Sequence, residues 1–562
     1  MRKLVQEILE EIKTGKNPNT IKRNISKKHK LPKLITNADI ISNLTDLERE
    51  KYASYFLTKP SRTGSGVIPV AIMTKPFQCP HVKKGIGPCI MCPGGPSSYF
   101  GDVPQSYTGN EPAARRALRQ NFNPYMQTFN RLEQYILLGN IPEKIQFIIM
   151  GGTFPATPVN YQKEFITQAF KALNDFSKLF FKKRFEYEKF KKFFELPGTI
   201  DDKDRLNSIQ NKLKKLNKKS NLEKEQRINE KAKIRCIGLV IETRPDYSNL
   251  KEANLMLELG CTSVELGIQS VYDSVLQASK RGHSVQDSVN AIRTLKDLGF
   301  KINTHYMLGL PSSTKEMDLQ GLQTLFTDGN FRPDMLKIYP CLITKGTELY
   351  NLWKNNKYLP MKNEEAIKII SEFKKTIPTY VRIMRIQRDI AENLVEAGVF
   401  KTNLRQYVQN ELKNQGLTCN CIRCRELKDK DDLKNIKPLI KEYAASEGKE
   451  YFISFENIKK NKIAGFCRLR IPSQELRKEI TKNSAIVREL HVYGNQTSIG
   501  EEGDIQHKGL GKKLLKIAEK LSRQNKKSKL VIISGIGVRE YYKKLGYKKE
   551  GQYMIKNLPQ KC

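Results

Sequence analysis

Three cysteines stand in one short loop rich in glycine and proline, CPHVKKGIGPCIMCPGG, residues 79–95. Cys79, Cys89 and Cys92 have the spacing Cys-x9-Cys-x2-Cys, which suits a disulfide, a redox pair, a zinc site or an iron–sulfur cluster. A zinc site needs a fourth ligand, and His81 could supply it. A 4Fe-4S cluster held by three thiolates instead keeps one iron open to a substrate or cofactor. The loop by itself leaves both metals open.

A second group of cysteines stands in CNCIRC, residues 419–424. Thiolates so close in sequence repel one another unless a cation holds them, so the group indicates a metal site. Zinc is the favoured ion, as a structural link between two domains, and a second iron–sulfur cluster is the alternative. The expected ligands are Cys419, Cys421 and Cys424, and the sequence shows no fourth. Isolated cysteines in apolar runs, such as Cys236 and Cys261, are expected to be inert core residues.

A third stretch, IQHKGLGKKLL at residues 505–515, has the features of a phosphate-binding loop. Two glycines precede a helical pattern, so backbone N–H groups and the positive end of the helix dipole would face a phosphate. Glycine also lets the backbone approach a pyrophosphate without a side chain in between. The loop residues concerned are Gln506, His507, Lys508, Gly509 and Gly511. Because glycine before a helix is also common in ordinary turns, this motif indicates a phosphate site only if the elements on either side of it support the assignment.

Short apolar, β-branched runs separated by helical patterns must position these groups. The runs begin at residues 67, 144, 235, 262, 301 and 334. Strands that alternate with helices predict a parallel sheet with crossover helices, here an open (β/α)6 version of the α/β barrel. The cysteine loop and the motifs GGTF, ETRPD, GIQS and LGLP each follow a predicted strand. Chemistry in such barrels collects at the carboxyl ends of the strands, so these motifs should share one rim.

The rest of the chain divides into four regions. Residues 1–60 look helical and basic, 61–360 form the partial barrel, 361–428 read as helices ending in the second cysteine group, and 429–562 form an α+β domain. A lysine-rich segment, about 175–233, interrupts the barrel between its second and third units, and we expect it to be a solvated helical hairpin.

Charge and hydropathy narrow the class of protein. The 562 residues include 99 Lys and Arg against 59 Asp and Glu, a formal net charge of +40. Such an excess favours a polyanionic partner, above all nucleic acid. No apolar run approaches the length of a membrane span, and the amphipathic N-terminus is unlike a signal peptide. We therefore expect a cytoplasmic protein without a membrane partner, in which clustered cysteines bind metal rather than form disulfides.

Several motifs together resemble those of radical S-adenosylmethionine enzymes, and in particular the catalytic subunit of Elongator. They are the cysteine loop, SYTGNEPAARRA at 106–117, FIIMGGTF at 147–154 and IETRPD at 241–246. Most radical S-adenosylmethionine enzymes space their cysteines Cys-x3-Cys-x2-Cys, whereas the longer first gap is typical of this family. The resemblance implies that Cys79, Cys89 and Cys92 hold the 4Fe-4S cluster. It also implies that the S-adenosyl-L-methionine cofactor contacts Gly151, Gly152 and Thr153.

The C-terminal region resembles GNAT acetyltransferases, again in the form found in Elongator. A strand, IVRELHVY, precedes the glycine loop, and SGIGVREYYKKLGY follows at 534–547. By this resemblance, acetyl-CoA is bound by the loop from Gln506 to Gly511 and by the backbone of a strand segment. That segment comprises Glu489, Leu490, His491 and Val492. The resemblance places Tyr542, with Tyr541 beside it, near the thioester and Lys144 of the barrel on the CoA.

The resemblance implies an acyltransferase that builds 5-carboxymethyluridine at wobble position 34, in the anticodon stem-loop of tRNA. A 5′-deoxyadenosyl radical would take hydrogen from the acetyl methyl group, and the resulting carbon radical would add to carbon 5 of uridine before water releases CoA. An electron donor is implied, and the need for accessory subunits stays open. The basic N-terminal region would grip the tRNA backbone through Lys22, Arg23, Lys27, Lys28 and Lys30.

Two other classes of protein remain open. A protein lysine acetyltransferase with a structural iron–sulfur cluster would need an acidic peptide groove and a carboxylate base, for which Glu489 is the candidate. The basic chain argues against that class. A tRNA-binding scaffold with inactive sites is disfavoured by the complete cysteine and glycine motifs.

Overall fold

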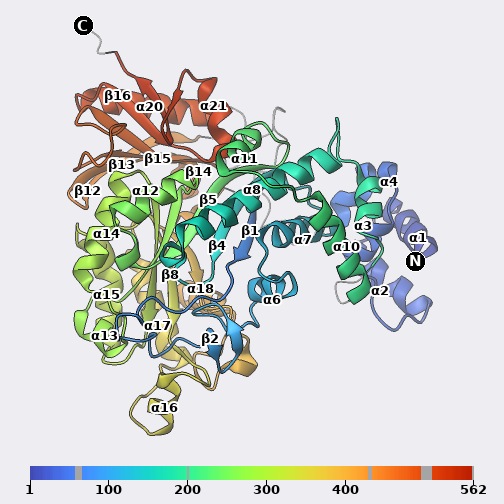
Figure 1. Ribbon diagram of the computed structural model, residues 1–562, viewed down its shortest axis with the longest axis horizontal. Helices are drawn as coiled ribbons and strands as arrows, with labels where there is room; N and C mark the ends of the chain where they lie inside the picture. Colours follow the sequence, from blue (N-terminus) through green and yellow to red (C-terminus); the bar gives the residue numbers. More distant parts are fainter. Residues whose placement is uncertain (57–65, 199–201, 428–432, 434, 495–508, 560–562) are drawn as a thin grey trace.

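The computed structural model describes residues 1–56, 66–198, 202–427, 433, 435–494 and 509–559. Figure 1 shows a group of N-terminal helices on one side, a central parallel sheet wrapped by helices, and a second sheet across one end of the first. No helix in the described ranges is long and apolar enough to cross a membrane.

The N-terminal region is helical, as its sequence predicts. Its helices are α1 (Arg2–Lys13), α2 (Pro18–Lys28), α3 (Asn37–Asn43) and α4 (Asp46–Tyr52). Asn17 caps α2, and Thr36 and Thr45 form capping boxes at the starts of α3 and α4, which satisfies N–H groups that have no partner within the helix. Apolar side chains of α1 and α2 are buried against one another, leaving the basic residues outside.

Seven parallel strands form the central sheet, in the order β1-β4-β5-β6-β7-β8-β10. They are β1 (Val67–Met73), β4 (Lys144–Met150), β5 (Arg235–Thr243), β6 (Ser263–Gln269), β7 (Lys301–Leu308), β8 (Met335–Pro340) and β10 (Arg382–Ile386). The first six confirm the predicted partial barrel. The seventh, β10, corrects the expectation that 361–428 is helical: Ile383 and Ile386 are buried, and the strand pairs with β8.

Helices cover the outer face of this sheet. They include α7 (Pro124–Leu137), α12 (Leu250–Glu258), α14 (Val285–Asp297), α15 (Lys315–Thr327) and α17 (Asn363–Thr376). On β4, Ile145, Phe147 and Ile149 belong to the large core beneath these helices. Because side chains alternate along a strand, Gln146 and its counterparts on the other strands face the inside of the partial barrel.

The lysine-rich segment is a packed bridge rather than the solvated hairpin that its composition predicts. It comprises the end of α8 (Val159–Phe180), α9 (Tyr187–Phe193), α10 (Lys203–Leu216) and α11 (Leu222–Asn229). Tyr187 donates a hydrogen bond of 2.6 Å from its hydroxyl to the Ile41 carbonyl of α3. Glu230 pairs with Arg539 and Lys543 of the C-terminal domain, each at 3.0 Å. Phenylalanines at helical spacing form its core, so the lysines only mark the outer faces.

The C-terminal domain is a second seven-stranded sheet, β12-β13-β14-β15-β16-β18-β17. Its strands are β12 (Lys437–Ala445), β13 (Gly448–Asn457), β14 (Lys462–Ile471), β15 (Ser484–Val492), β16 (Lys529–Ile533), β17 (Lys548–Glu550) and β18 (Tyr553–Asn557). Helices α20 (Leu510–Gln524) and α21 (Arg539–Lys543) complete it. All pairings are antiparallel except β15 with β16.

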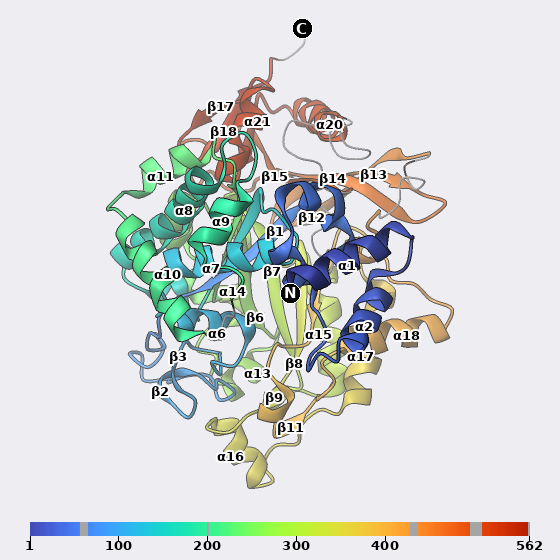
Figure 2. The same cartoon turned by 90° about the vertical axis from the view of Figure 1, so that its right-hand side faces the viewer.

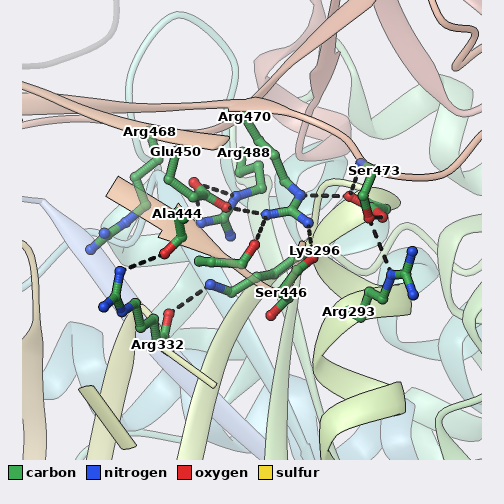
Figure 3. Close-up of polar contacts among 12 residues, drawn as sticks. Arg293, Lys296, Arg332, Ala444, Ser446, Glu450, Arg468, Arg470, Ser473 and Arg488 are labelled. Carbon is green, nitrogen blue, oxygen red and sulfur yellow. Dashed lines mark hydrogen bonds and ion pairs between the residues drawn. The ribbon is translucent and has the colours of Figure 1, made fainter. Parts of the chain in front are cut away.

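Buried ion pairs hold the C-terminal sheet on the amino ends of the parallel strands (Figure 3). Arg470 pairs with Asp297, at the end of α14, at 2.6 Å. Arg488 pairs with Asp334, just before β8, also at 2.6 Å. The cysteine loop leaves the opposite, carboxyl end of β1, and Figure 2 shows the C-terminal sheet and β2 (Gly95–Ser98) at opposite ends of the central strands.

Candidate functional site

The first cysteine loop lies at the carboxyl rim of the partial barrel. The main-chain N–H of Ser106 approaches Cys92 Sγ at 3.3 Å, and Gln105 Oε1 lies 3.1 Å from the same sulfur. The three sulfurs do not all lie within 4.8 Å of one another, since the described residues hold one such cysteine group and it is at 419–424. This wider spacing suits a cluster in which each thiolate binds its own iron.

Two buried arginines face Cys89. Nη1 of Arg281 lies 3.1 Å from Cys89 Sγ, and Nη1 of Arg244 lies 3.5 Å from it. Burial alone would raise the pKa of this thiol, yet the two guanidinium groups overcome that effect and the pKa is lowered. A buried site with excess positive charge fits an anionic group held by thiolates, so these residues fit a 4Fe-4S cluster.

His81 bonds to a carboxylate through one ring nitrogen, and among the described residues it does not join a group of three close metal-ligating atoms. Its Nε2 is 2.6 Å from Oδ2 of Asp246, which follows β5, and Asp246 also receives Arg244 Nε at 3.1 Å. His81 is fully buried and therefore fastens the cysteine loop to the ETRPD segment. This arrangement disfavours the alternative of zinc held by three cysteines and His81.

The GGT segment after β4 borders the cysteine loop. Gly151 and Gly152 have φ values of +121° and +97°, which glycine adopts without strain. A methyl group at Gly151 would lie 2.2 Å from Oγ1 of Thr74, and one at Gly152 would lie 2.9 Å from Cβ of Gln105. Thr153 begins the short 3₁₀ helix that follows. Of the three residues predicted to hold the methionyl group, Gly152 thus lies beside Gln105, which contacts Cys92.

The second cysteine group lies between the two large domains. The Sγ atoms of Cys419, Cys421 and Cys424 all lie within 4.8 Å of one another, which suits one ion better than a cluster. The chain on either side bonds to both domains, with Ile422 N–H donating to the Val381 carbonyl at 2.9 Å and Leu427 N–H to the Ile463 carbonyl at 3.1 Å. A single zinc ion fits this donor set and position.

The C-terminal sheet opens where acetyl-CoA is expected. β15 pairs with β16 only from Ser484 to Val487 within the described residues, while its other edge stays paired with β14 as far as Val492. Among the described residues, no strand therefore lies beside one backbone edge of Glu489, Leu490, His491 and Val492. Gly509 caps α20 with a φ of +77°, and a methyl group at Gly511 would lie 3.9 Å from Cδ2 of Leu490, so the N-terminus of this helix lies beside the strand segment. Gln506, His507 and Lys508 lie outside the described residues.

The two tyrosines of α21 differ in their surroundings. A methyl group at Gly511 would lie 2.9 Å from the hydroxyl oxygen of Tyr541, so Tyr541 reaches the N-terminus of α20. Tyr542 is buried in the domain's own core, where burial raises its pKa. The structure therefore brings Tyr541 to the predicted phosphate site and packs Tyr542 behind it.

Glu489 and Lys144 lie at the junction of the two domains. Arg468 Nε contacts Oε2 of Glu489 at 2.9 Å, and Lys301 Nζ lies 4.0 Å from Oε1. Although burial would raise it, these cations lower the pKa of Glu489, so the carboxylate is a paired anion rather than a poised base. Lys144 opens β4 beside Arg235 of β5, against which residues 535–537 of the C-terminal domain pack.

The basic residues of α2 form part of the N-terminal surface. Arg23, Lys27, Lys28 and Lys30 are exposed, whereas Lys22 is half-buried and donates to Asn37 Oδ1 at 2.5 Å. Lys28 pairs with Glu7 at 2.6 Å. Four of the five predicted tRNA contacts thus have no acidic partner among the described residues.

Sequence reasoning missed the arginines that face Cys89 and the arginines that join the domains. Arg244 stands within the quoted ETRPD motif, so its place after a strand was a usable signal. Arg281 lies in the loop before α14, and Arg468, Arg470 and Arg488 lie in ordinary strand patterns, so only the tertiary structure shows their contacts.

The chain matches known families over most of its length. Residues 1–64 match the ELP3 N-terminal domain, 88–320 the Radical SAM superfamily and 333–414 the Radical_SAM C-terminal domain. The chain is 42% identical to the tRNA uridine(34) acetyltransferase of Methanocaldococcus infernus over 99% of both chains. It is 35% identical to Elongator complex protein 3 of Danio rerio, over 99% of this chain and 96% of that one.

A solved structure of Methanocaldococcus infernus Elp3 that lacks residues 1–46 has a TM-score of 0.70 and 40% identity, covering 88% of this chain and all of that one. Fold and site thus define a radical S-adenosylmethionine enzyme with a GNAT-type C-terminal domain. The chain belongs to the family of Elongator complex protein 3 and the archaeal tRNA uridine(34) acetyltransferases. The alignments run through the lysine-rich segment as well, which the sequence resemblance had left out.

Proposed function

We propose that this protein is an acyltransferase that forms 5-carboxymethyluridine at the wobble position of tRNA, using S-adenosylmethionine and acetyl-CoA. The observation that carries the proposal is that one chain holds both the cysteine site and the predicted acetyl-CoA site, in two domains joined by buried ion pairs. Three cysteines with compensating arginines occupy one end of the parallel sheet, and an open strand edge beside a helix N-terminus occupies the other. Full-length relatives named tRNA uridine(34) acetyltransferase support the substrate.

Each residue set has a distinct proposed role. Cys79, Cys89 and Cys92 hold a 4Fe-4S cluster, which when bound with S-adenosylmethionine supplies the one-electron chemistry of a 5′-deoxyadenosyl radical. Arg244 and Arg281 neutralise the buried thiolates. The backbone of residues 489–492 and the loop to Gly511 bind acetyl-CoA, with Tyr541 at the phosphates. In this proposal, residues 1–60 contact tRNA, the partial barrel 61–360 holds the cluster, residues 361–428 hold the zinc ion, and residues 429–562 bind acetyl-CoA.

The cysteines at 419–424 are proposed to hold one structural zinc ion, and the exposed lysines of α2 to contact tRNA phosphates. The excess of 99 basic over 59 acidic residues supports the second role. The competing function, acetylation of protein lysines, is disfavoured because Glu489 is ion-paired with Arg468. An electron donor and a cytoplasmic location also belong to the proposal.

The test is a product analysis with the protein reconstituted under anaerobic conditions. Iron, sulfide, reductant, S-adenosylmethionine, acetyl-CoA and unmodified tRNA are supplied, and digested RNA is analysed by mass spectrometry. We expect 5-carboxymethyluridine from the wild type and none from Cys89→Ala. Acetylated protein lysines without modified uridine would contradict the proposal.

A further inference from the structure

A layer of ionisable side chains crosses the inner face of the parallel sheet. Glu242 of β5, Glu265 of β6, His305 of β7 and Lys337 of β8 face one another there. Lys337 forms an ion pair with Glu265 and lies 4.0 Å from Glu242, and His305 Nε2 lies 3.2 Å from Glu265. Interior positions of α/β barrels are usually filled by Val, Ile and Leu. Since apolar side chains would fill this space at less cost, the ionisable layer points to a function.

This layer lies between the two sites described above. Towards the cysteine loop, Tyr107 donates from its hydroxyl to Glu242 at 2.7 Å, and Tyr107 follows Ser106, which contacts Cys92. Towards the C-terminal domain, Lys301 opens β7 and lies 4.0 Å from Glu489. Four residues of a strand span about 13 Å, so His305 lies about that far from Lys301.

One buried polar atom in this layer has no hydrogen-bond partner among the described residues. Asn303, between Lys301 and His305 on the same face of β7, donates from Nδ2 to Glu265 Oε1 at 3.1 Å. Its Oδ1 has no hydrogen-bond partner among the described residues, although Asn303 is 1% exposed. Buried amide oxygens without a partner are rare and call for a ligand or water. The side chains of Glu242 and Lys337 stay 16% and 12% accessible, so a solvent-sized group can reach them.

We propose that Asn303 and Lys337, supported by Glu242, Glu265 and His305, bind the base that receives the acyl group, and that they select uracil. The inference rests on the proposed function and adds the residues that determine its specificity. Uracil presents an imide N–H between two carbonyl oxygens. The Lys337 ammonium donates to one carbonyl oxygen, and Asn303 Oδ1 accepts from the imide N–H. Cytosine has a bare ring nitrogen in place of that N–H, which would leave Asn303 Oδ1 facing a lone pair.

The test compares the binding of three anticodon stem-loops that differ only at the wobble position. They carry uridine, cytidine or an abasic site, and binding to the full-length protein is measured with saturating CoA present and no S-adenosylmethionine. Because paired hydrogen bonds to a base edge discriminate against a base that lacks the matching groups, we expect uridine to bind about tenfold more tightly than the other two. Asn303→Ala should bring the three affinities together while leaving that of the abasic loop unchanged.

Two further variants make the result decisive. Lys337→Met should act like Asn303→Ala, and Asn290→Ala, an exposed asparagine on the outer helix α14, should keep the uridine preference. Circular dichroism reports folding, and if Lys337→Met does not fold, the neutral Asn303→Ala decides. A uridine preference that survives Asn303→Ala, or equal wild-type binding of all three loops, would overturn this inference but not the proposed function. Failure to bind even the abasic loop would instead count against the proposed tRNA function.

Discussion

Arg488 and Asp334 form a bidentate ion pair across the junction of the two domains. Arg488 Nη2 lies 2.6 Å from Asp334 Oδ1 and Nη1 lies 2.7 Å from Oδ2, and both side chains are fully buried. Arg488 stands next to the proposed acetyl-CoA strand segment, and Asp334 stands just before β8, which carries Lys337. The pair therefore fixes the acetyl-CoA edge on the amino end of the partial barrel.

Removal of one partner of this pair should be costly. Asp334→Ala removes the bidentate partner of the buried Arg488, which keeps only Glu450, and breaking a buried pair in this way costs about 3–5 kcal/mol. The free energy of unfolding from denaturant titration measures the loss. Asp389→Ala removes a surface ion pair with Arg385 and should change stability by less than about 1 kcal/mol. Equal effects of the two variants would contradict the assigned role.

The iron content of the protein should depend on the first cysteine group and on the arginines that face it. After anaerobic reconstitution, Cys89→Ala should lose most iron and acid-labile sulfide because a thiolate is missing. Cys341→Ala is the matched control, since Cys341 is buried in the same apolar cluster as Cys89. Arg281→Met should retain less iron than the wild type because it removes a compensating charge. Full iron in Cys89→Ala would show that the cluster ligands are wrongly assigned.

Zinc should be bound at one ion per chain by the second cysteine group. Cys421→Ser should lower zinc in elemental analysis to a small fraction of the wild-type content and lower the melting temperature, because metal binding contributes folding energy. Cys467→Ser alters a buried cysteine in the C-terminal core and should leave the zinc content unchanged. Iron in place of zinc at this position would instead support a second iron–sulfur cluster.

The space between Gly511 and Tyr541 should control acetyl-CoA affinity. Gly511→Ala places a methyl group 2.9 Å from the Tyr541 hydroxyl, so the ring must move away from the predicted phosphate site. We expect acetyl-CoA binding by calorimetry to weaken about tenfold, or about 1.4 kcal/mol. Tyr541→Phe removes the clashing oxygen, and the double variant should bind like Tyr541→Phe alone. No recovery in the double variant would mean that Gly511 acts through another contact.

Stability should depend on pH through Glu242. Burial and the neighbouring Glu265 raise the pKa of Glu242 from 4.5 to about 7. The native state then binds this proton more tightly than the unfolded state does. The stabilisation of the native state that results is fully present below pH 4.5 and is lost as pH rises through 7.

Glu242→Gln resembles the protonated form, so its stability relative to the wild type should increase between pH 5 and pH 8, by about 2 kcal/mol. Unfolding titrations at both pH values measure this. Glu10→Gln, at an exposed position of α1, should show no such trend. A constant difference between Glu242→Gln and the wild type would place the titration elsewhere.

Much of the fold follows from local patterns in the sequence. Each of the six predicted strands is a short run rich in apolar, β-branched residues, and helical patterns separate the runs, which together indicate a parallel sheet. The strand β10 was not predicted because its sequence, RIMRI, is short and contains two arginines. The packing of the bridge at 175–233 was not predicted because lysines dominate its composition. Its phenylalanines form a core only when α8 and α9 pack together.

The candidate site was predictable only in its contiguous motifs. Cysteine spacing and glycine loops are local and carry their chemistry in the sequence. Glu242, Glu265 and Lys337 read as ordinary polar positions of alternating strands, because the sequence does not show which face of a strand is enclosed. Arg281 reaches Cys89 across 192 residues of chain, and no local pattern reports such a contact.

The most direct test of the central claim is the fate of the acetyl hydrogens. The reconstituted protein is given acetyl-CoA with three deuterium atoms on the methyl group, together with S-adenosylmethionine, reductant and tRNA, and the 5′-deoxyadenosine is analysed by mass spectrometry. We predict one deuterium in 5′-deoxyadenosine and a carboxymethyl group on uridine derived from the labelled acetyl. Unlabelled 5′-deoxyadenosine, with deuterated acetyl groups on protein lysines, would contradict the account.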